Sequence, residues 1–134
     1  MSAPDVSILI VHTFERRLIR QTLRGLRRAA PQLHVEVLVI DNNPDVGLLE
    51  MLKKEFPEVK YFPKRNEGFG SAMNVGMKHA RGKYVLVFNP DIIISAGALE
   101  KLFYYMEANP QVGIVGPKLL NADGSLQYSC YRYP

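Results

Sequence analysis

Short apolar runs alternate with longer segments of helical periodicity along most of the chain. Each run holds four to six residues, rich in Val, Ile, Leu or aromatic side chains and often β-branched. Runs of this length and composition are typical of strands buried in a parallel sheet. The pattern therefore predicts five strands, at residues 6–11, 35–40, 59–62, 84–88 and 112–115.

The segments between these runs carry apolar residues at helical spacing. In the first of them, Leu18, Ile19 and Leu23 fall on one face. Ser95 is expected to be the N-cap of the last helix. Gly76 is unfavourable inside a helix, which indicates close packing against a strand. Helices are predicted at residues 15–30, 47–56, 69–80 and 95–108.

This strand–helix alternation predicts one α/β domain over residues 1–134, with an open, mostly parallel sheet and helices on both faces. Near the end, Lys118–Leu120 and Leu126–Ser129 flank the turn Asn121–Gly124, which has hairpin chemistry. The chain then stops at Pro134 without a further element. We expect a domain that is incomplete at its C-terminus, and its exposed apolar surface would favour a homo-oligomer.

Composition narrows the class of protein. The chain has 134 residues, of which 47% are hydrophobic, and no apolar run approaches the roughly 20 residues of a membrane span. The first residues show no signal peptide. The single Cys130 excludes an internal disulfide and a cysteine metal cluster. These features predict a cytoplasmic chain.

The positive charge belongs to one segment. Six arginines lie within Arg16–Arg28, and the remaining 11 basic residues are outnumbered by 13 acidic ones. This distribution argues against a nucleic-acid surface over the whole domain. The arginine face is interpreted either as the solvated back of a helix or as a peripheral contact with an anionic membrane.

Polar residues follow three of the predicted strands. His12 and Thr13 end the first strand, Asp41 ends the second, and Asn89-Pro90-Asp91 ends the fourth. Ligands of open α/β sheets bind at this carboxyl edge. The two aspartates could accept hydrogen bonds from a base or ribose, or bind a divalent cation; alternatively, each caps a turn. Asn89 would add a neutral oxygen ligand.

The turn Asn66–Gly70 opens the third predicted helix, where backbone N–H groups could approach a phosphate. It is not a dinucleotide fingerprint, since Met73 stands where a third glycine would be required, and no Walker motif is present. His34 and His79 have no partners at zinc-binding spacing.

In this order the motifs resemble the N-terminal half of inverting family 2 glycosyltransferases with the GT-A fold, closest to a bacterial rhamnosyltransferase-like branch. The series N-x-G-F-G, A-R-G-x-Y and N-P-D is specific to that resemblance. The stretches that carry it are V-S-I-L-I-V, V-L-V-I-D-N-N, N-E-G-F-G-S-A-M-N-V-G, A-R-G-K-Y-V-L-V-F-N-P-D and G-I-V-G-P-K-L-L-N-A-D-G-S-L-Q.

The resemblance implies a role for each candidate residue. Asp91, with Asn89, would occupy the place of the D-x-D motif and bind Mg²⁺ or Mn²⁺ bridging the diphosphate of a dTDP- or UDP-linked sugar. The nucleotide pocket would be lined by His12, Thr13, Asp41, Asn66 and Gly68.

The sequence also departs from the family pattern. Thr13-Phe14 replaces a usual Tyr-Asn, Pro44-Asp45-Val46 replaces a Ser-Thr-Asp run, and Asn89 replaces the first D-x-D carboxylate. The family's catalytic base and acceptor pocket belong to a C-terminal half, so no general base is identified in this chain.

The expected function is inverting transfer of a sugar to a hydroxyl of a glycan or lipid-linked acceptor, in cell-surface polysaccharide synthesis at the inner face of the cell membrane. The 134-residue chain alone is expected to turn over poorly or not at all. The alternative is a non-catalytic nucleotide-binding or assembly module. A flavodoxin-like signalling domain would require an acidic cluster at the end of the first strand, where His12-Thr13 stands.

Overall fold

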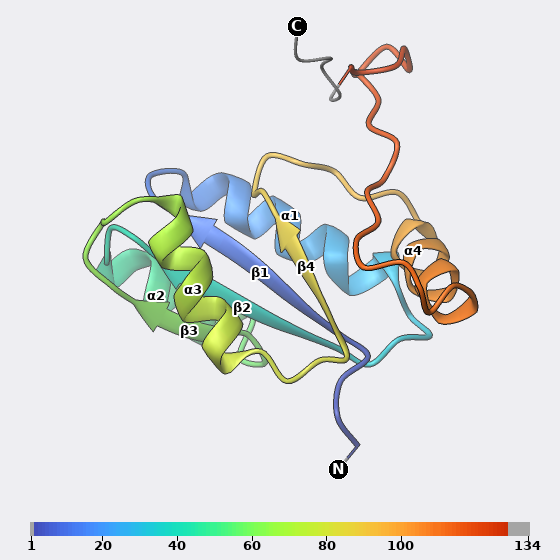
Figure 1. Ribbon diagram of the computed structural model, residues 1–134. Helices are drawn as coiled ribbons and strands as arrows, with labels where there is room; N and C mark the ends of the chain where they lie inside the picture. The colour runs from blue at the N-terminus through green and yellow to red at the C-terminus, as the bar shows by residue number, and fades with distance from the viewer. Residues whose placement is uncertain (1, 129–134) are drawn as a thin grey trace, which may run out of the picture.

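The computed structural model describes residues 2–128 (Figure 1). Strands and helices alternate as the hydrophobic pattern predicted, and the bounds of the first seven elements agree with the prediction to within one residue. In chain order the elements are β1 (Val6–His12), α1 (Arg16–Ala29), β2 (Val35–Asp41), α2 (Val46–Glu55), β3 (Lys60–Pro63), α3 (Phe69–His79), β4 (Tyr84–Phe88) and α4 (Ala98–Ala108).

The strands form one sheet in the order β3-β2-β1-β4, with every pairing parallel. The predicted open parallel α/β sheet is confirmed. β1 is central, and its last residue, His12, lies in register with Asp41 of β2. Asp41 in turn lies beside Pro63 of β3. Parallel pairing therefore gathers the predicted polar strand ends at one edge.

Helices cover both faces of the sheet, as predicted (Figure 1). Along β1, Ile8 and Ile10 join the apolar cluster formed with α1, α2 and α4. Leu9 and Val11 point to the opposite face and pack with Ala72 and Met73 of α3. This period-two alternation within a fully buried strand explains why β1 is apolar at nearly every position.

Gly76 allows α3 to lie close to the sheet. A Cβ at this position would meet Cδ1 of Leu9 at 2.9 Å and Cδ1 of Ile40 at 3.0 Å. The close packing that the sequence indicated is therefore present, and it offsets the low helix propensity of glycine.

A hydrogen-bonded cluster around Glu36 stabilises the amino-terminal end of the sheet, opposite the edge that carries His12 and Asp41. The Glu36 carboxylate accepts hydrogen bonds from Ser7, from Nζ of Lys60 at 2.5 Å and from the backbone N–H of Arg81 at 2.6 Å. Ser7 also accepts from the N–H of Gly82 at 2.8 Å. Burial opposes ionisation, but the hydrogen bonds from Lys60, Ser7 and Arg81 prevail and lower the pKa of Glu36 to about 2.

Two predictions near the C-terminal end are wrong. Residues 112–115 form no strand: Ile114 is 91% exposed, and no ladder of hydrogen bonds pairs the segment with a neighbour within residues 2–128. The last helix begins at Ala98 after Gly97, whose φ of 74° is left-handed, so Ser95 is not its N-cap. Ser95 instead accepts a hydrogen bond from Ala98 through its carbonyl.

The predicted hairpin is reduced to a turn and one bridge. The N–H of Gly124 donates to the carbonyl of Asn121 at 2.9 Å, and Leu120 pairs with Leu126 in an isolated antiparallel bridge. Ser129, the predicted end of the hairpin, and Cys130 lie outside the described residues.

The arginine face of α1 contacts α2 as well as solvent. Four of its six arginines reach acidic residues in or beside α2, and the guanidinium of Arg27 also lies 4.5 Å from the centre of the Phe56 ring. The pairs are Arg16–Asp45 at 3.6 Å, Arg20–Glu55 at 3.0 Å, Arg24–Glu55 at 3.1 Å and Arg27–Glu58 at 2.8 Å. Within residues 2–128, no helix is both long and apolar enough to cross a membrane.

Candidate functional site at the carboxyl edge of the sheet

The ends of β1 and β2 hold a buried polar pair. Nδ1 of His12 lies 2.9 Å from Oδ1 of Asp41, and the two residues are 2% and 0% exposed. An ionised carboxylate only accepts hydrogen bonds, so Nδ1 carries the proton that lies between them. Asp41 thereby fixes the orientation of the imidazole and leaves Nε2 as the ring nitrogen without a partner in residues 2–128.

Asp41 is fully engaged within the protein. Its Oδ2 accepts a hydrogen bond from the Tyr61 hydroxyl at 2.8 Å, and its Oδ1 also accepts from the backbone N–H of Asn43 at 3.0 Å. Burial, together with this hydrogen bond to Asp41, raises the pKa of Tyr61 well above its usual value. Asp41 therefore organises the edge of the sheet, with His12 and Tyr61 on either side of it.

Tyr61 was not predicted as a site residue. Its hydroxyl reaches Asp41 because β3 lies next to β2 in the sheet. A tyrosine in the strand following Asp41 was the available signal, but its value depended on knowing the strand order.

Two buried polar atoms at this edge have no hydrogen-bond partner within residues 2–128: Nε2 of His12 and Oδ1 of Asn42. Buried polar atoms normally find partners, so each has unused capacity for a ligand or a water molecule. The Nδ2 of Asn42 donates to the carbonyl of Gly68 at 3.5 Å, which links β2 to the turn before α3. Asn42 was not predicted from the sequence as a site residue.

The turn before α3 is shaped by glycine. Gly68 has a φ of 93°, a left-handed conformation that favours glycine, and its N–H donates to Oδ1 of Asn66 at 3.0 Å. Glu67 accepts from Lys64 and from Ser71, each at 3.2 Å. Asn66 and Gly68 are exposed, and α3 begins immediately afterwards at Phe69. The turn therefore places exposed backbone at a helix start beside the His12–Asp41 pair.

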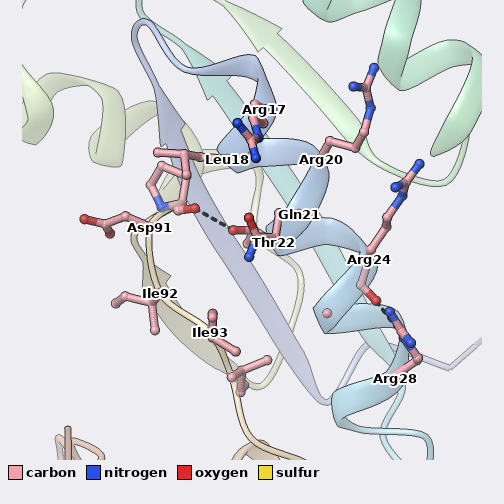
Figure 2. Close-up of a pocket in the computed structure, with 13 residues that line it drawn as sticks. Arg17, Leu18, Arg20, Gln21, Thr22, Arg24, Arg28, Asp91, Ile92 and Ile93 are labelled. Atoms are coloured by element: carbon pink, nitrogen blue, oxygen red, sulfur yellow. Dashed lines mark hydrogen bonds between the residues drawn. The ribbon is translucent and has the colours of Figure 1, made fainter. Parts of the chain in front are cut away.

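Asn89 and Asp91 lie on the other half of the same edge. Phe88 ends β4 in register with Ile10, two residues before His12 ends β1. The carbonyl of Pro90 accepts a hydrogen bond from the Thr22 hydroxyl of α1 at 2.6 Å, which fixes the turn after β4. Asp91 is exposed and borders a pocket of about 560 Å³ against α1 (Figure 2).

The structure thus brings most predicted site residues to one edge, in two groups. His12, Asp41 and Gly68 are joined through direct hydrogen bonds or through Asn42, whereas Asn89 and Asp91 form no hydrogen bond to them in the described part of the chain. Thr13 follows His12 and is half-buried.

Few side chains at this edge of the sheet could coordinate a metal ion. Residues 2–128 contain no group of three or more His, Cys, Asp or Glu side chains that could hold an ion. Asp91 offers one exposed carboxylate, and Asn89 is exposed two residues before it. Such a pair fits a hard cation that takes its remaining oxygens from phosphate and water, as Mg²⁺ commonly does. It does not form a preassembled metal cage.

The chain is an α/β protein with an open parallel sheet, and the carboxyl edge of that sheet carries unsatisfied polar atoms and an exposed carboxylate. Ligands of such sheets bind at this edge. The model of glycosyl transferase family 2 matches residues 7–129, and the chain belongs to that family.

The chain is also similar in sequence to proteins from several bacteria. An uncharacterised glycosyltransferase of Rickettsia bellii is 33% identical over 95 residues, covering 68% of this chain and 14% of the relative. The minor teichoic acid biosynthesis protein GgaB of Bacillus subtilis is 32% identical over 66% of this chain and 10% of its own length. The N-acetylglucosaminyl-diphospho-decaprenol L-rhamnosyltransferase of Mycobacterium tuberculosis is 29% identical over 78% of this chain and 38% of its own length.

Solved structures share the fold. The mannosyltransferase PcManGT of Pyrobaculum calidifontis, in complex with GDP-Man and Mn²⁺, matches 84% of this chain and 34% of its own with a TM-score of 0.69 at 20% identity. TarS of S. aureus in complex with UDP-GlcNAc matches 79% of this chain and 32% of its own with a TM-score of 0.62 at 21% identity. The chain spans well under two thirds of these proteins, and its GT-A-like fold is established.

Proposed function

We propose that this chain forms the donor-binding part of an inverting glycosyltransferase that uses a nucleotide-diphosphate sugar. The observation that carries the proposal is the shared sheet edge. There, the buried His12–Asp41 pair and the exposed Asp91 follow neighbouring parallel strands. Buried atoms with unused hydrogen-bonding capacity suit a base or ribose, and an exposed carboxylate suits a phosphate-bound cation.

In this proposal the nucleoside lies over the ends of β1 and β2. His12 and Thr13 line its pocket, with Nε2 of His12 hydrogen-bonded to the base or ribose. Asp41 borders the base or ribose, and its carboxylate also holds His12 and Tyr61 in position. Asn66 and Gly68 lie beside the nucleotide, where the start of α3 favours negative charge.

The diphosphate would lie toward Asp91 and Asn89. A divalent cation, Mg²⁺ or Mn²⁺, would stabilise the negative charge that develops on the departing nucleoside diphosphate when it is bound there. In the transfer, the acceptor oxygen bonds to the anomeric carbon with inversion as the carbon–oxygen bond to phosphate breaks. The hydroxyl proton passes to a base that these site residues do not supply.

The relatives support a setting and a range of donors for the proposal. GgaB is a teichoic acid biosynthesis protein, and the mycobacterial relative is a rhamnosyltransferase acting on a diphospho-decaprenol compound. We propose a UDP- or dTDP-linked hexose or rhamnose as the donor. A glycan or lipid-linked hydroxyl would be the acceptor, at the inner face of the cell membrane in surface polysaccharide synthesis.

Calorimetric titration with UDP, dTDP and GDP, with and without Mn²⁺, tests the binding function. We expect binding of at least one nucleotide and tighter binding with Mn²⁺. Asp91→Asn should remove the increment that Mn²⁺ gives and spare metal-free binding. Asp123→Asn, in the distant exposed turn, serves as the charge-matched control. Absence of binding to every nucleotide under both conditions would contradict the proposal.

One observation favours a second candidate, a non-catalytic nucleotide-binding or assembly module. The turn after β4 offers a single carboxylate, because Asn89 stands where a second one would strengthen metal binding. The two functions differ in turnover. Release of nucleoside diphosphate from a UDP- or dTDP-sugar, measured with acceptor present, would support the enzyme; tight binding without release would support the module.

A further inference from the structure

A groove runs along the outer side of α1, next to the turn that carries Asp91. Its two walls are the exposed flank of α1 and the segment 90–94, and it encloses about 560 Å³ (Figure 2). The hydrogen bond from the Thr22 hydroxyl to the carbonyl of Pro90, at 2.6 Å, holds the two walls together. The two walls of the groove are therefore in direct contact at Thr22 and Pro90.

The α1 wall carries an excess of positive charge. Arg17, Arg20, Arg24 and Arg28 line it. Arg20 and Arg24 share Glu55, whereas Arg17 and Arg28 have no carboxylate partner within residues 2–128. A wall with two uncompensated guanidinium groups favours a phosphate, which arginine binds through its fixed fork of N–H donors.

Asp91 is the one acidic residue among those that line the groove. In Figure 2 its carboxylate points away from the arginine side chains, and no ion pair joins it to them. The carboxylate therefore leaves the arginine wall available for an anion while it borders the same groove.

The opposite wall is apolar. Ile92 and Ile94 pack against the main core, and Ile93 between them is 79% exposed. An isoleucine turned to solvent opposite unpaired arginines gives the groove a cationic side and an apolar side. That combination matches the boundary of a lipid bilayer, where phosphates lie next to hydrocarbon.

We propose that this groove docks the protein on an anionic membrane surface. Arg17 and Arg28 would bind lipid phosphates, and Ile93 would enter the hydrocarbon boundary. Free phosphate or nucleic acid would satisfy the arginines alone and leave Ile93 in water. The apolar face of α1 is buried in the core, with Ile19 and Leu23 at most 2% exposed, so the docking surface is the groove and not the helix face itself.

This proposal goes beyond nucleotide binding and does not depend on it. Asp91 connects the two sites, because it borders the groove and also lies at the proposed diphosphate position. Docking through the groove would hold the donor site at the surface where a lipid-linked acceptor is presented.

Sedimentation with vesicles tests the proposal on the whole chain. We expect binding to phosphatidylcholine vesicles that contain phosphatidylglycerol, weak binding to pure phosphatidylcholine, and a decrease with added salt. Absence of binding to the anionic vesicles overturns the proposal. Vesicle-independent binding of inorganic phosphate, or preferential binding of RNA or DNA of equal charge, also overturns it.

Paired variants locate the contact. Arg17→Gln with Arg28→Gln should weaken vesicle binding by about tenfold or more, the size expected for two basic residues beside an anionic surface. Lys53→Gln with Lys54→Gln removes the same charge from exposed positions of α2 and should have a smaller effect. Equal losses in the two pairs would show unspecific attraction and overturn the assignment to the groove.

Ile93→Ser isolates the apolar contribution. It should weaken vesicle binding roughly fivefold because less apolar surface enters the bilayer. Ile114→Ser changes a residue that is 91% exposed elsewhere and should change little. An Ile93→Ser variant that binds like the wild type overturns the lipid assignment. Circular dichroism confirms that each variant is folded. Nucleotide titration of the same samples shows whether nucleotide binding is retained, so a loss of vesicle binding can be distinguished from a failure of the proposed function.

Discussion

His12 and Asp41 lie in register at the ends of adjacent parallel strands, and their side chains meet at 2.9 Å in a fully buried environment. The contact follows directly from parallel pairing, since each residue is the last of its strand. Tyr61 extends it to β3 through the second carboxylate oxygen. One aspartate therefore connects three strands at the edge where the nucleotide is proposed to bind.

Asp41→Asn should destabilise the fold by about 1–3 kcal/mol, because an amide can accept through one oxygen only and leaves His12 or Tyr61 unpaired in a buried place. Tyr61→Phe, which removes a single donor, should cost less. Urea unfolding of both variants measures the difference. If Asp41→Asn unfolds at the wild-type urea concentration, the three-residue cluster does not stabilise this edge.

Glu36 should make the free energy of unfolding depend on pH in the acidic range. Its pKa is about 2 in the folded protein against an ordinary 4.5, so its contribution is present above about pH 4.5 and is lost as pH falls toward 2. With an allowance for solvent screening, we expect a loss of about 1–2 kcal/mol. Comparing the free energy of unfolding at pH 7 and pH 3 measures it.

Glu36→Gln supplies the control for this pH effect. The variant should be less stable at pH 7 and should lose less stability on acidification, whereas Glu50→Gln, on the exposed side of α2, should follow the wild type. Equal pH dependence in Glu36→Gln and the wild type would assign the acid sensitivity to other groups.

The sequence predicted the elements well because their periodicity is strong. β1 and α3 show the reason: β1 is apolar at every position except Ser7 and His12, and α3 places Ala72, Met73 and Gly76 on one buried side. The segment 112–115 has the same apolar composition and forms no strand, because a strand also requires a neighbour with which to pair.

The candidate site was predicted in part for the same physical reason. Parallel strands carry their carboxyl ends to one edge, so His12 and Asp41 could be placed together in advance. The bond from Tyr61 to Asp41 and the ion pairs from α1 to Glu55 depend on which elements become neighbours. Hydrophobic periodicity does not specify that order.

Gly76→Ala should be destabilising by about 1–2 kcal/mol. The new Cβ would press on Leu9 and Ile40 in the core, and overpacking of this kind outweighs the gain of about 1 kcal/mol in helix propensity. Gly70→Ala in the same helix meets no atom within 4 Å and should be neutral or stabilising. Thermal unfolding of the pair checks this; equal melting temperatures would refute the close-packing argument.

Asn89→Asp should strengthen the binding of a metal ion in the absence of nucleotide. The substitution places a second carboxylate two positions before Asp91 in an exposed turn, and hard cations prefer charged oxygen ligands. We expect Mn²⁺ affinity, measured by calorimetry without nucleotide, to rise roughly tenfold or more. Asn74→Asp, on the exposed side of α3, adds the same charge away from the site. If both variants bind Mn²⁺ equally, the turn after β4 does not direct a cation, and the assignment of Asp91 to the diphosphate loses its support.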